Sequence, residues 1–307
     1  MASINTRKKS LLVLLQHEGA FHVMLLAPAI FVLIYRYVPM AGIVLAFKTY
    51  RARLGIFGSP WVGLENFKIL FSMPGFLDAI RNTIVIALSK IALGIVVPVV
   101  FSLMLNEVSN PRIKKSVQTI VYMPHFISWV LMAGIIIKMM AQYGIINKFI
   151  TSMGLDPVMF LSDKQLFPQI VVFTDIWKEF GYASIVYLAA ITGIDPNLYE
   201  AASIDGAGRW RQTLHITLPG MIATIILMTA LSLGRVLDAG FDQIFNLYSP
   251  VVYKTGDILD TFTYRMAFQN SQFAISTAAS LFKSAIGCFM IVFSYRIAYK
   301  VSGYQIF

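Results

Sequence analysis

Residues 195–220 read DPNLYEAASIDGAGRWRQTLHITLPG and form a polar stretch between two long apolar stretches. Asp195 followed by Pro196 predicts the start of a helix, because the carboxylate can accept early backbone N–H groups and proline lacks a donor that would be unpaired there. The helix would have one small apolar face, formed by Leu198, Ala201, Ala202 and Ile204. We therefore expect a folded surface here rather than a simple tether.

The glycines that follow predict a corner in the same segment. Asp205-Gly206, together with Gly208, should end the first helix, since glycine adopts backbone conformations that other residues avoid. Arg209-Trp210-Arg211 then begins a second polar turn that leads to Leu218-Pro219. Two short helices around a glycine corner predict a rigid contact surface at a membrane face.

The composition indicates a membrane protein that crosses the bilayer several times. The chain of 307 residues is 57% apolar and only 13% charged, which is more apolar than soluble folds usually are. Its net charge of +10 does not indicate nucleic-acid binding, because many Lys and Arg residues lie between or inside apolar stretches. Anionic lipid head groups explain these positions more simply. The single cysteine, Cys288, excludes an intramolecular disulfide and disfavours a metal cluster.

A helix that crosses the hydrocarbon core needs about 20 apolar residues. Six regions meet this requirement, and the fold class predicted is an all-α membrane protein with spans near 21–47, 77–105, 117–141, 166–193, 216–245 and 274–300. Residues 1–20 would be a cytoplasmic N-terminal segment and residues 21–307 a single six-helix domain. The first span has no small-residue cleavage site after it, so we expect it to be retained. Ser162 and Gln165 predict a capping box at the start of the fourth span.

An even number of spans places both termini on one side of the membrane. The basic residues favour that side by ten to eight, and the short link with Arg112, Lys114 and Lys115 has the most orienting weight. Both termini and the 195–220 segment are therefore expected in the cytoplasm. The outer connections near 48–76, 142–165 and 246–273 either receive an extracellular partner or simply cover the helix ends.

The 195–220 segment resembles the EAA loop of bacterial ABC importer permeases. The resemblance rests on Glu200-Ala201-Ala202, Asp205-Gly206-Ala207, Ile216, Leu218 and Pro219, and Leu214 departs from it by standing where the family usually has Phe. Six spans with this loop between the fourth and fifth match the type I importer core over nearly the whole chain. More narrowly, the chain resembles the LplB-like carbohydrate-uptake permeases, as judged from Leu233-Gly234-Arg235, Phe241-Asp242-Gln243-Ile244, Asp257-Ile258-Leu259-Asp260-Thr261 and Phe282-Lys283-Ser284.

The resemblance implies a permease subunit of the bacterial cell membrane that moves an oligosaccharide inward by alternating access. Its loop would sit in a cleft of a cytoplasmic ABC ATPase dimer. Small side chains at Ala201 and Ala202 would permit close approach, Glu200 and Asp205 could cap helix ends or meet basic groups, and Trp210 would be an anchor. The other implied partners are an extracellular solute-binding protein and a second permease chain. In the sugar group the two permeases are usually different chains, and a homodimer is the alternative.

The sequence contains no phosphate-cradling loop of the form G-x-x-x-x-G-K-[ST]. ATP and Mg are therefore expected on the separate ATPase, and no catalytic residue, cofactor or metal is expected in this chain.

Ionisable residues inside the spans suggest function by default, because burying charge in a bilayer is costly. One interpretation is that they form structural pairs, such as Lys90 or Lys283 with Asp175, Glu179 or Asp238. The other is a hydrated cavity in which aromatic rings stack on sugars and carboxylates bind hydroxyl groups. The candidates for such a path, on the spans that the resemblance indicates, are Tyr122, His125, Trp129, Trp177, Glu179, Tyr182, Arg235, Asp238 and Asp242. His125 after Pro124 could equally be a packed helix residue, and Arg235 could pair with Asp238 at i,i+3.

Two other functions stay open at this point. The same kind of importer could carry another solute, such as a peptide, an amino acid or an acidic sugar. An ion-coupled secondary transporter could use Asp175 or Glu179 as a proton site, although this leaves the 195–220 segment unexplained. A membrane-bound enzyme has no supporting motif.

Overall fold

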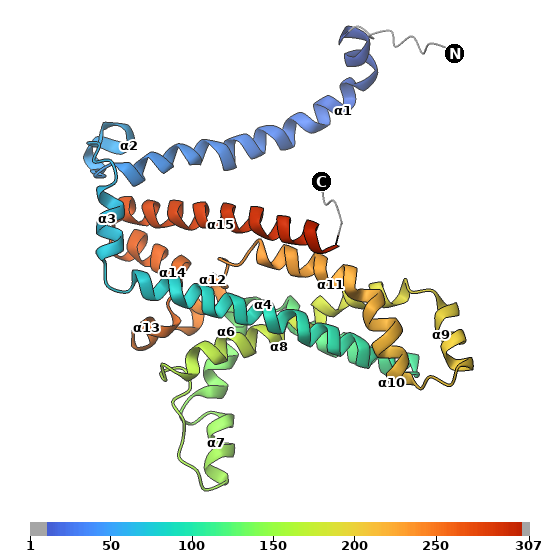
Figure 1. Cartoon of the computed structure of the whole chain (residues 1–307). Coiled ribbons are helices and arrows are strands. Elements are labelled where there is room, and N and C mark those ends of the chain that lie inside the picture. Colours follow the sequence, from blue (N-terminus) through green and yellow to red (C-terminus); the bar gives the residue numbers. More distant parts are fainter. Residues whose placement is uncertain (1–10, 303–307) are drawn as a thin grey trace.

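The computed structural model describes residues 11–302, and the regular secondary structure of this part of the chain is helical apart from one isolated β-bridge between Lys48 and Trp61. The first helix, α1 (Leu11–Val32), continues through a π-helical turn (Leu33–Tyr37) into a 3-10 segment (Val38–Phe47). Figure 1 shows α1 leaning away from the other helices. Only the far end of this run, Val38–Phe47, packs against the last helix, α15 (Phe273–Ser302). The predicted N-terminal segment 1–20 lies partly outside the described residues.

The centre of the bundle is the pair α4 (Phe76–Asn106) and α8 (Leu166–Thr192), which pack side by side (Figure 1). Their shared core includes Ile86, Val171 and Val172, and it continues into Val236 and Ile244 further along the chain. Burial of these side chains places the segment around 236–244 against both helices. Two further apolar clusters lie elsewhere in the bundle, one around Phe76 and Phe262 and one around Tyr187 and Met221.

The third predicted span is two helices rather than one. The amphipathic α5 (Pro111–Tyr122) is followed by a short 3-10 turn (Met123–Phe126), and α6 (Trp129–Met140) begins after an extended Ile127. Pro124 explains the break, because proline removes a backbone donor and restricts the residue before it. Ser128 then caps α6 by accepting a hydrogen bond from the Leu131 N–H at 3.5 Å.

The fifth predicted span ends earlier than expected. It runs without interruption from α10 (Arg209–Gln212) through a π-helical turn (Thr213–Thr217) and α11 (Leu218–Leu233). The chain then leaves the helix in a turn over 234–240, and α12 (Phe241–Leu247) starts after Gly240, whose φ of +96° favours glycine. Arg235 and Asp238 therefore lie in a non-helical turn, and the prediction of a helix over 216–245 is wrong there.

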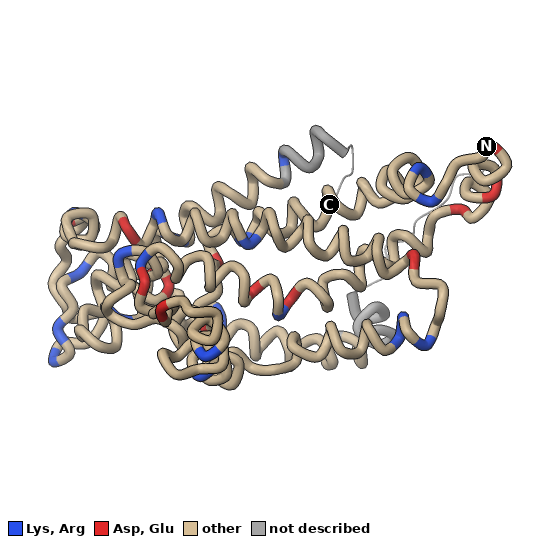
Figure 2. Tube along the Cα trace, turned by 90° about the horizontal axis from the view of Figure 1, so that it is seen from below, with Lys and Arg blue, Asp and Glu red and all other residues tan. Residues whose placement is uncertain are grey.

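Five ranges are long and apolar enough to cross a membrane: Gly19–Phe47, Phe76–Asn106, Trp129–Ser152, Arg209–Leu233 and Phe273–Ser294. The third of these includes α7 (Ile145–Ser152). Helix α8, 27 residues long, corresponds to the fourth predicted span and is absent from these five ranges, since it carries Asp175, Lys178 and Glu179. Its packing along α4 places these charges inside the bundle. Figure 2 shows that the other charged residues gather mainly toward the two ends of the bundle.

Short helices close the end of the bundle opposite the 195–220 segment. They are a 3-10 turn (Ala52–Leu54), α2 (Gly55–Gly58), α3 (Glu65–Ser72), a 3-10 turn (Pro250–Val252), α13 (Tyr253–Gly256), α14 (Leu259–Tyr264) and a π-helical turn (Arg265–Gln269). The start of α8 lies at this end too, and it differs from the prediction. Asp163, not Ser162, caps it, since the Asp163 carboxylate accepts from the N–H groups of Gln165 at 2.7 Å and Leu166 at 3.0 Å. Asp is as good a cap as Ser.

Candidate functional site

The segment 195–217 folds as predicted, into two helices around a glycine corner. Helix α9 (Pro196–Ile204) starts with the Asp195 carboxylate accepting from the Asn197 N–H at 3.0 Å. Gly206 has φ +75°, a left-handed conformation, and α10 begins after Gly208. Figure 1 shows α9 and α10 together at one end of the bundle. The local chemistry of Asp, Pro and Gly is sufficient to produce this shape.

Two side chains that the sequence did not single out hold α9 against the following helix. Gln212 Nε2 donates to Ser203 Oγ at 2.9 Å and to the Ala207 carbonyl at 3.0 Å. The hydroxyl groups of Tyr199 and Thr217 lie 3.0 Å apart. These contacts join positions five to eighteen residues apart and make the corner stiff. Nothing in the local pattern marks Gln212 or Tyr199 before the fold is known.

The same corner presents large apolar side chains to its surroundings. Ile204 is 87% exposed and Trp210 is 76% exposed, and Leu198 and Leu214 are also exposed. Glu200, Ala201 and Asp205 are exposed beside them, whereas Ala202 and Ala207 are half-buried. An apolar patch on a rigid polar segment marks an interaction site. Leu218 instead packs on a core cluster with Tyr187 and Met221, so Leu218-Pro219 is where the segment joins the bundle.

A second cluster forms where α8 passes the break in the third span. His125 Nδ1 lies 2.6 Å from Glu179 Oε2, and the His125 ring stacks on Tyr182 with centroids 3.9 Å apart. Lys178 donates to the His125 carbonyl at 2.9 Å and to Glu179 Oε1 at 2.8 Å. Its ammonium also lies 5.3 Å from the centre of the Trp129 ring. The predicted residues His125, Trp129, Glu179 and Tyr182 are therefore brought together.

Gly181 explains why these two elements meet so closely. A Cβ at this position would lie 2.3 Å from the Val121 carbonyl oxygen, so only glycine allows α5 to approach α8 here. Tyr122 ends α5 just before the cluster and is half-buried. No hydrogen bond or ring stacking joins it to His125 in the part of the chain that the structure describes. Lys178 and Gly181 were not among the predicted site residues.

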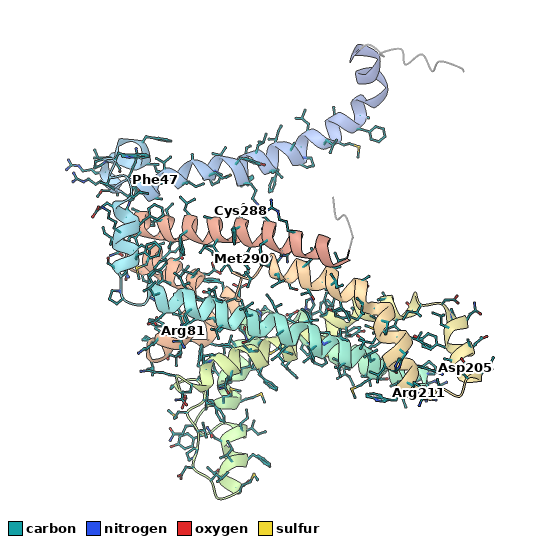
Figure 3. The ribbon with its side chains drawn as sticks, viewed as in Figure 1. Phe47, Arg81, Asp205, Arg211, Cys288 and Met290 are labelled. Carbon is teal, nitrogen blue, oxygen red and sulfur yellow. The ribbon has the colours of Figure 1, made fainter. Side chains whose placement is uncertain are left out.

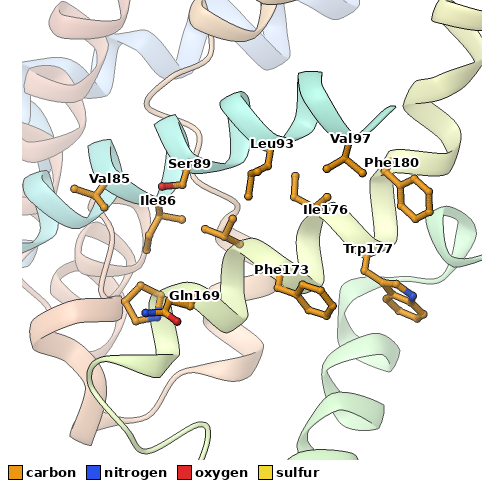
Figure 4. Close-up of a pocket in the computed structure, with 12 residues that line it drawn as sticks. Val85, Ile86, Ser89, Leu93, Val97, Gln169, Phe173, Ile176, Trp177 and Phe180 are labelled. Carbon is orange, nitrogen blue, oxygen red and sulfur yellow. The ribbon is translucent and has the colours of Figure 1, made fainter. Parts of the chain in front are cut away.

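Trp177 does not join this cluster. It lies on another side of α8 and lines a cavity of about 530 Å³ between α4 and α8. Figure 4 shows it there with Phe173, Phe180 and aliphatic side chains such as Leu93. This surface is apolar, and so its chemistry suits lipid tails or another helix better than sugar hydroxyl groups.

Lys90 ties α4, α8 and the 234–240 turn together. Its ammonium donates to Asp175 Oδ1 at 3.0 Å, to the Ala239 carbonyl at 2.9 Å and to Gln243 Oε1 at 2.5 Å. Gln243 in turn donates to the Val171 carbonyl at 2.7 Å. The interpretation of Lys90 and Asp175 as a structural pair is confirmed. We refer to Lys90, Asp175, Ala239 and Gln243 as the Lys90 joint.

The remaining intramembrane charges meet beside α15. Lys283 Nζ lies 2.9 Å from Asp238 Oδ1 and 2.7 Å from Asp260 Oδ1. The pairing of Lys283 with Asp238 is confirmed, while the predicted pairing of Arg235 with Asp238 is wrong because both lie in the turn after α11. Asp260 was not foreseen as a partner. Asp242 is exposed in the first turn of α12 and lies apart from this group.

Among residues 11–302, no group of three or more His, Cys, Asp or Glu side chains is arranged to hold a metal ion. The arrangement offers a stiff exposed corner, an aromatic cluster with a carboxylate, and charge pairs inside a helical bundle.

The comparisons with known proteins agree with this arrangement. Residues 91–302 match the family described as "Binding-protein-dependent transport system inner membrane component". The chain belongs to this family. It is 39% identical over 295 residues to the polygalacturonan/rhamnogalacturonan transport system permease protein YteP of Bacillus subtilis, covering 96% of this chain and 92% of the relative. It is 37% identical over 287 residues to protein LplB of the same organism, covering 93% and 90%.

A solved structure has the same fold. The chain matches a bacterial ABC transporter "involved in the import of the acidic polysaccharide alginate" with a TM-score of 0.89 and 37% identity, covering 96% of this chain and all of that one. The prediction of a type I ABC importer permease of the LplB-like carbohydrate-uptake group is confirmed. The chain is a multi-pass membrane component of an ABC importer.

Proposed function

We propose that this permease carries an oligosaccharide into a bacterial cell, driven by ATP hydrolysis on a separate ATPase. The observation that carries the proposal is the stiff corner at 195–217, which presents Ile204 and Trp210 at one end of the bundle. Relatives named for polygalacturonan/rhamnogalacturonan and alginate transport support an oligosaccharide as the solute. The chain covers more than nine tenths of both relatives' lengths, which supports carrying over the whole activity.

The corner would act as the lever between the ATPase and the spans. Helix α9 enters a cleft of the ATPase, where the small side chains of Ala201 and Ala202 permit close contact and Trp210 fills a pocket. Gln212 and Tyr199 prevent α9 from tilting on its own. Closure of the ATPase dimer around ATP and Mg then moves the continuous run from α10 into α11. That run leads to the turn at 234–240, so motion at one end reaches the middle of the bundle.

The complete importer would contain a second permease chain, an ATPase dimer and an extracellular solute-binding protein. A solved neighbour, 36% identical with a TM-score of 0.89, is in complex with an "alginate pentasaccharide-bound periplasmic protein". The apolar side chains of α1 are exposed over most of its length, which fits a helix that packs on the second permease. The corner and both termini would lie in the cytoplasm, and the short helices of the other end outside.

The aromatic cluster at the break in the third span is the proposed sugar platform. His125 and Tyr182 present a stacked pair of rings, and the Glu179 carboxylate beside them can accept hydrogen bonds from hydroxyl groups. Lys178 holds the backbone of the break at the His125 carbonyl. Movement of α8 against α5 would open or close this platform. Trp177 has no part in it.

Two experiments test the function. The reconstituted importer should hydrolyse ATP faster when its binding protein is loaded with an oligosaccharide, and stimulation by peptides or amino acids alone would refute the sugar assignment. Uptake that persists without ATP and collapses with the proton gradient would indicate an ion-coupled transporter instead. The structure disfavours that alternative, because Asp175 is already paired with Lys90.

A variant tests the coupling role directly. Glu200→Lys reverses an exposed charge on α9 and should abolish transport while the chain still inserts into the membrane. Glu65→Lys makes the same change on α3, at the opposite end of the bundle, and should leave binding of the ATPase unchanged. Normal transport by the Glu200 variant would exclude coupling through this helix.

A further inference from the structure

The charge pairs beside α15 line a cavity of about 610 Å³ between the 234–240 turn, α14 and α15. This volume lies within the range of about 300–1,000 Å³ for small-molecule sites. Its walls carry the hydroxyl groups of Thr263, Ser280 and Ser284, and none of the lining residues is aromatic. It therefore differs from both the aromatic cluster and the apolar cavity of Figure 4.

Lys283 has no free hydrogen-bond donor for a ligand in this cavity. Its ammonium has three donors, and these face Asp238 Oδ1 at 2.9 Å and the two oxygens of Asp260 at 2.7 and 2.9 Å. Two carboxylates and one ammonium leave the cluster with one negative charge. On its own, this cluster would repel an anion.

Arg235 changes the net charge of this cavity. It lines the same cavity and also a neighbouring one of about 250 Å³ that includes Lys90 and Asp175. Within residues 11–302, its guanidinium makes no ion pair, because Asp238 is bound to Lys283 and Asp175 to Lys90. Its positive charge cancels the excess negative charge of the Lys283 cluster. Arg235 is exposed in this chain, so the five donors of its guanidinium are accessible to a ligand that enters the cavity.

The backbone that carries Arg235 is fixed from both sides. On one side Lys90 donates to the Ala239 carbonyl, and a Cβ at Gly240 would lie 2.8 Å from the Lys90 ammonium. On the other side Asp238 is bound to Lys283 on α15. The guanidinium is thus presented from a turn that is held by a hydrogen bond from Lys90 and by the ion pair of Asp238 with Lys283. A guanidinium forms two parallel hydrogen bonds with a planar carboxylate, which an ammonium cannot do.

We propose that Arg235 binds a sugar carboxylate in this cavity, so that the permease itself selects acidic oligosaccharides over neutral ones. The inference rests on the proposed function, since it names the chemical class of the oligosaccharide. Arg235 determines the net charge of the cavity. With it the cavity is neutral and offers a guanidinium to a carboxylate, and without it the two aspartates leave a negative charge that favours a neutral sugar donating hydroxyl groups.

The native Cys288 can report whether a sugar occupies this cavity. It is the only cysteine in the chain, it is exposed, and it lines the same cavity. Figure 3 shows it on α15, away from the corner that bears Asp205. The experiment measures the rate at which a maleimide labels Cys288 in the complete importer, read on this chain by mass spectrometry. The binding protein is omitted, because its own specificity would mask that of the permease.

The two probes are a galacturonate trisaccharide and its carboxyl-reduced, neutral counterpart. The acidic probe should slow labelling at concentrations at which the neutral probe does not. Arg235→Gln should raise the concentration of acidic probe needed for half protection by about tenfold or more, the usual worth of a hydrogen bond to a charged group. Arg235→Lys keeps the charge but loses the planar fork, and should recover only part of the preference. Arg81→Gln, which removes an exposed arginine from α4, should behave as the wild type.

The outcomes separate this inference from the proposed function. Equal protection by both probes, or an unchanged preference in Arg235→Gln, would overturn the role of Arg235 while leaving oligosaccharide import intact. Absence of protection by either probe would overturn the cavity as the site, provided that the loaded binding protein still stimulates ATP hydrolysis in the same preparation. If that stimulation also fails with every oligosaccharide, the proposed function itself is refuted. Co-purification of the ATPase with each variant checks that the variant is folded.

Discussion

The corner at 195–217 and the Lys90 joint both contain charged residues, but the corner keeps its charges exposed and the joint pairs them inside the bundle. The corner keeps Glu200 and Asp205 exposed, and its stiffness comes from the hydrogen bonds of Gln212 and Tyr199. In the joint, Lys90 and Asp175 are paired inside the bundle, with side chains only 10% and 22% exposed. Removing Lys90 from the joint leaves the Asp175 carboxylate inside the bundle without its ion-pair partner. Removing a side chain from the corner leaves only a smaller surface.

The largest effect on stability is expected at the joint. Lys90→Met leaves the Asp175 carboxylate unpaired and should destabilise the chain by about 3–5 kcal/mol. A lowered unfolding temperature of the purified protein in detergent would show this. Lys138→Met, which removes an exposed lysine from α6, is the control and should change little. The double variant Lys90→Met/Asp175→Leu should recover much of the loss, and failure to do so would mean that the backbone contact to Ala239 matters more than the ion pair.

At the corner, the largest effect should be on association rather than stability. Trp210→Ala should weaken ATPase binding by about 2 kcal/mol or more if this side chain is an anchor. The unfolding temperature should not change, because Trp210 is 76% exposed in this chain. Phe57→Ala removes a ring that is 77% exposed at the opposite end of the bundle, and should leave ATPase binding intact. Equal loss in both variants would contradict a specific anchor.

The conformation of the corner gives a smaller expected effect. Gly206→Ala places a Cβ on a residue with φ +75° and should cost about 1–2 kcal/mol in the local fold. Transport per ATP hydrolysed should fall, since the angle between α9 and α10 would relax. Gly208→Ala is a matched control, because a Cβ there also meets nothing within 4 Å and the φ of −67° suits alanine. Indistinguishable transport by the two variants would show that the corner is not under conformational constraint.

The smallest effect should come from the surface pair beside α10. Arg209 Nη1 lies 3.6 Å from Glu107 Oε2, and the Arg209 side chain is 74% exposed. Exposed pairs contribute about 0–1 kcal/mol. Glu107→Gln should therefore leave the unfolding temperature within about 1 °C of the wild type at moderate salt. A large shift would mean that the corner is held by charge as well as by Gln212 and Tyr199.

The spans show how far hydropathy alone can predict a fold. Each predicted span corresponds to a helical region because crossing a bilayer imposes length and apolarity on a continuous segment. The break at Pro124 and the end of the helix at Leu233 were missed, since an average over many residues conceals a short polar turn. Those two places carry His125 and Arg235, so the errors in the spans fell where the candidate sites are.

The sequence by itself determined the corner at 195–217, because Asp195, Pro196 and Gly206 act on backbone within a few residues of themselves. It also determined that the charges inside the spans needed partners. Only the tertiary structure decided which partners they have. Lys90 reaches Asp175 across 85 positions of the chain, and Lys283 binds Asp260 from a short helix that no hydropathy pattern marks. Carboxylates are chemically equivalent in the sequence, and the packing of α8 and α14 brings particular ones within reach.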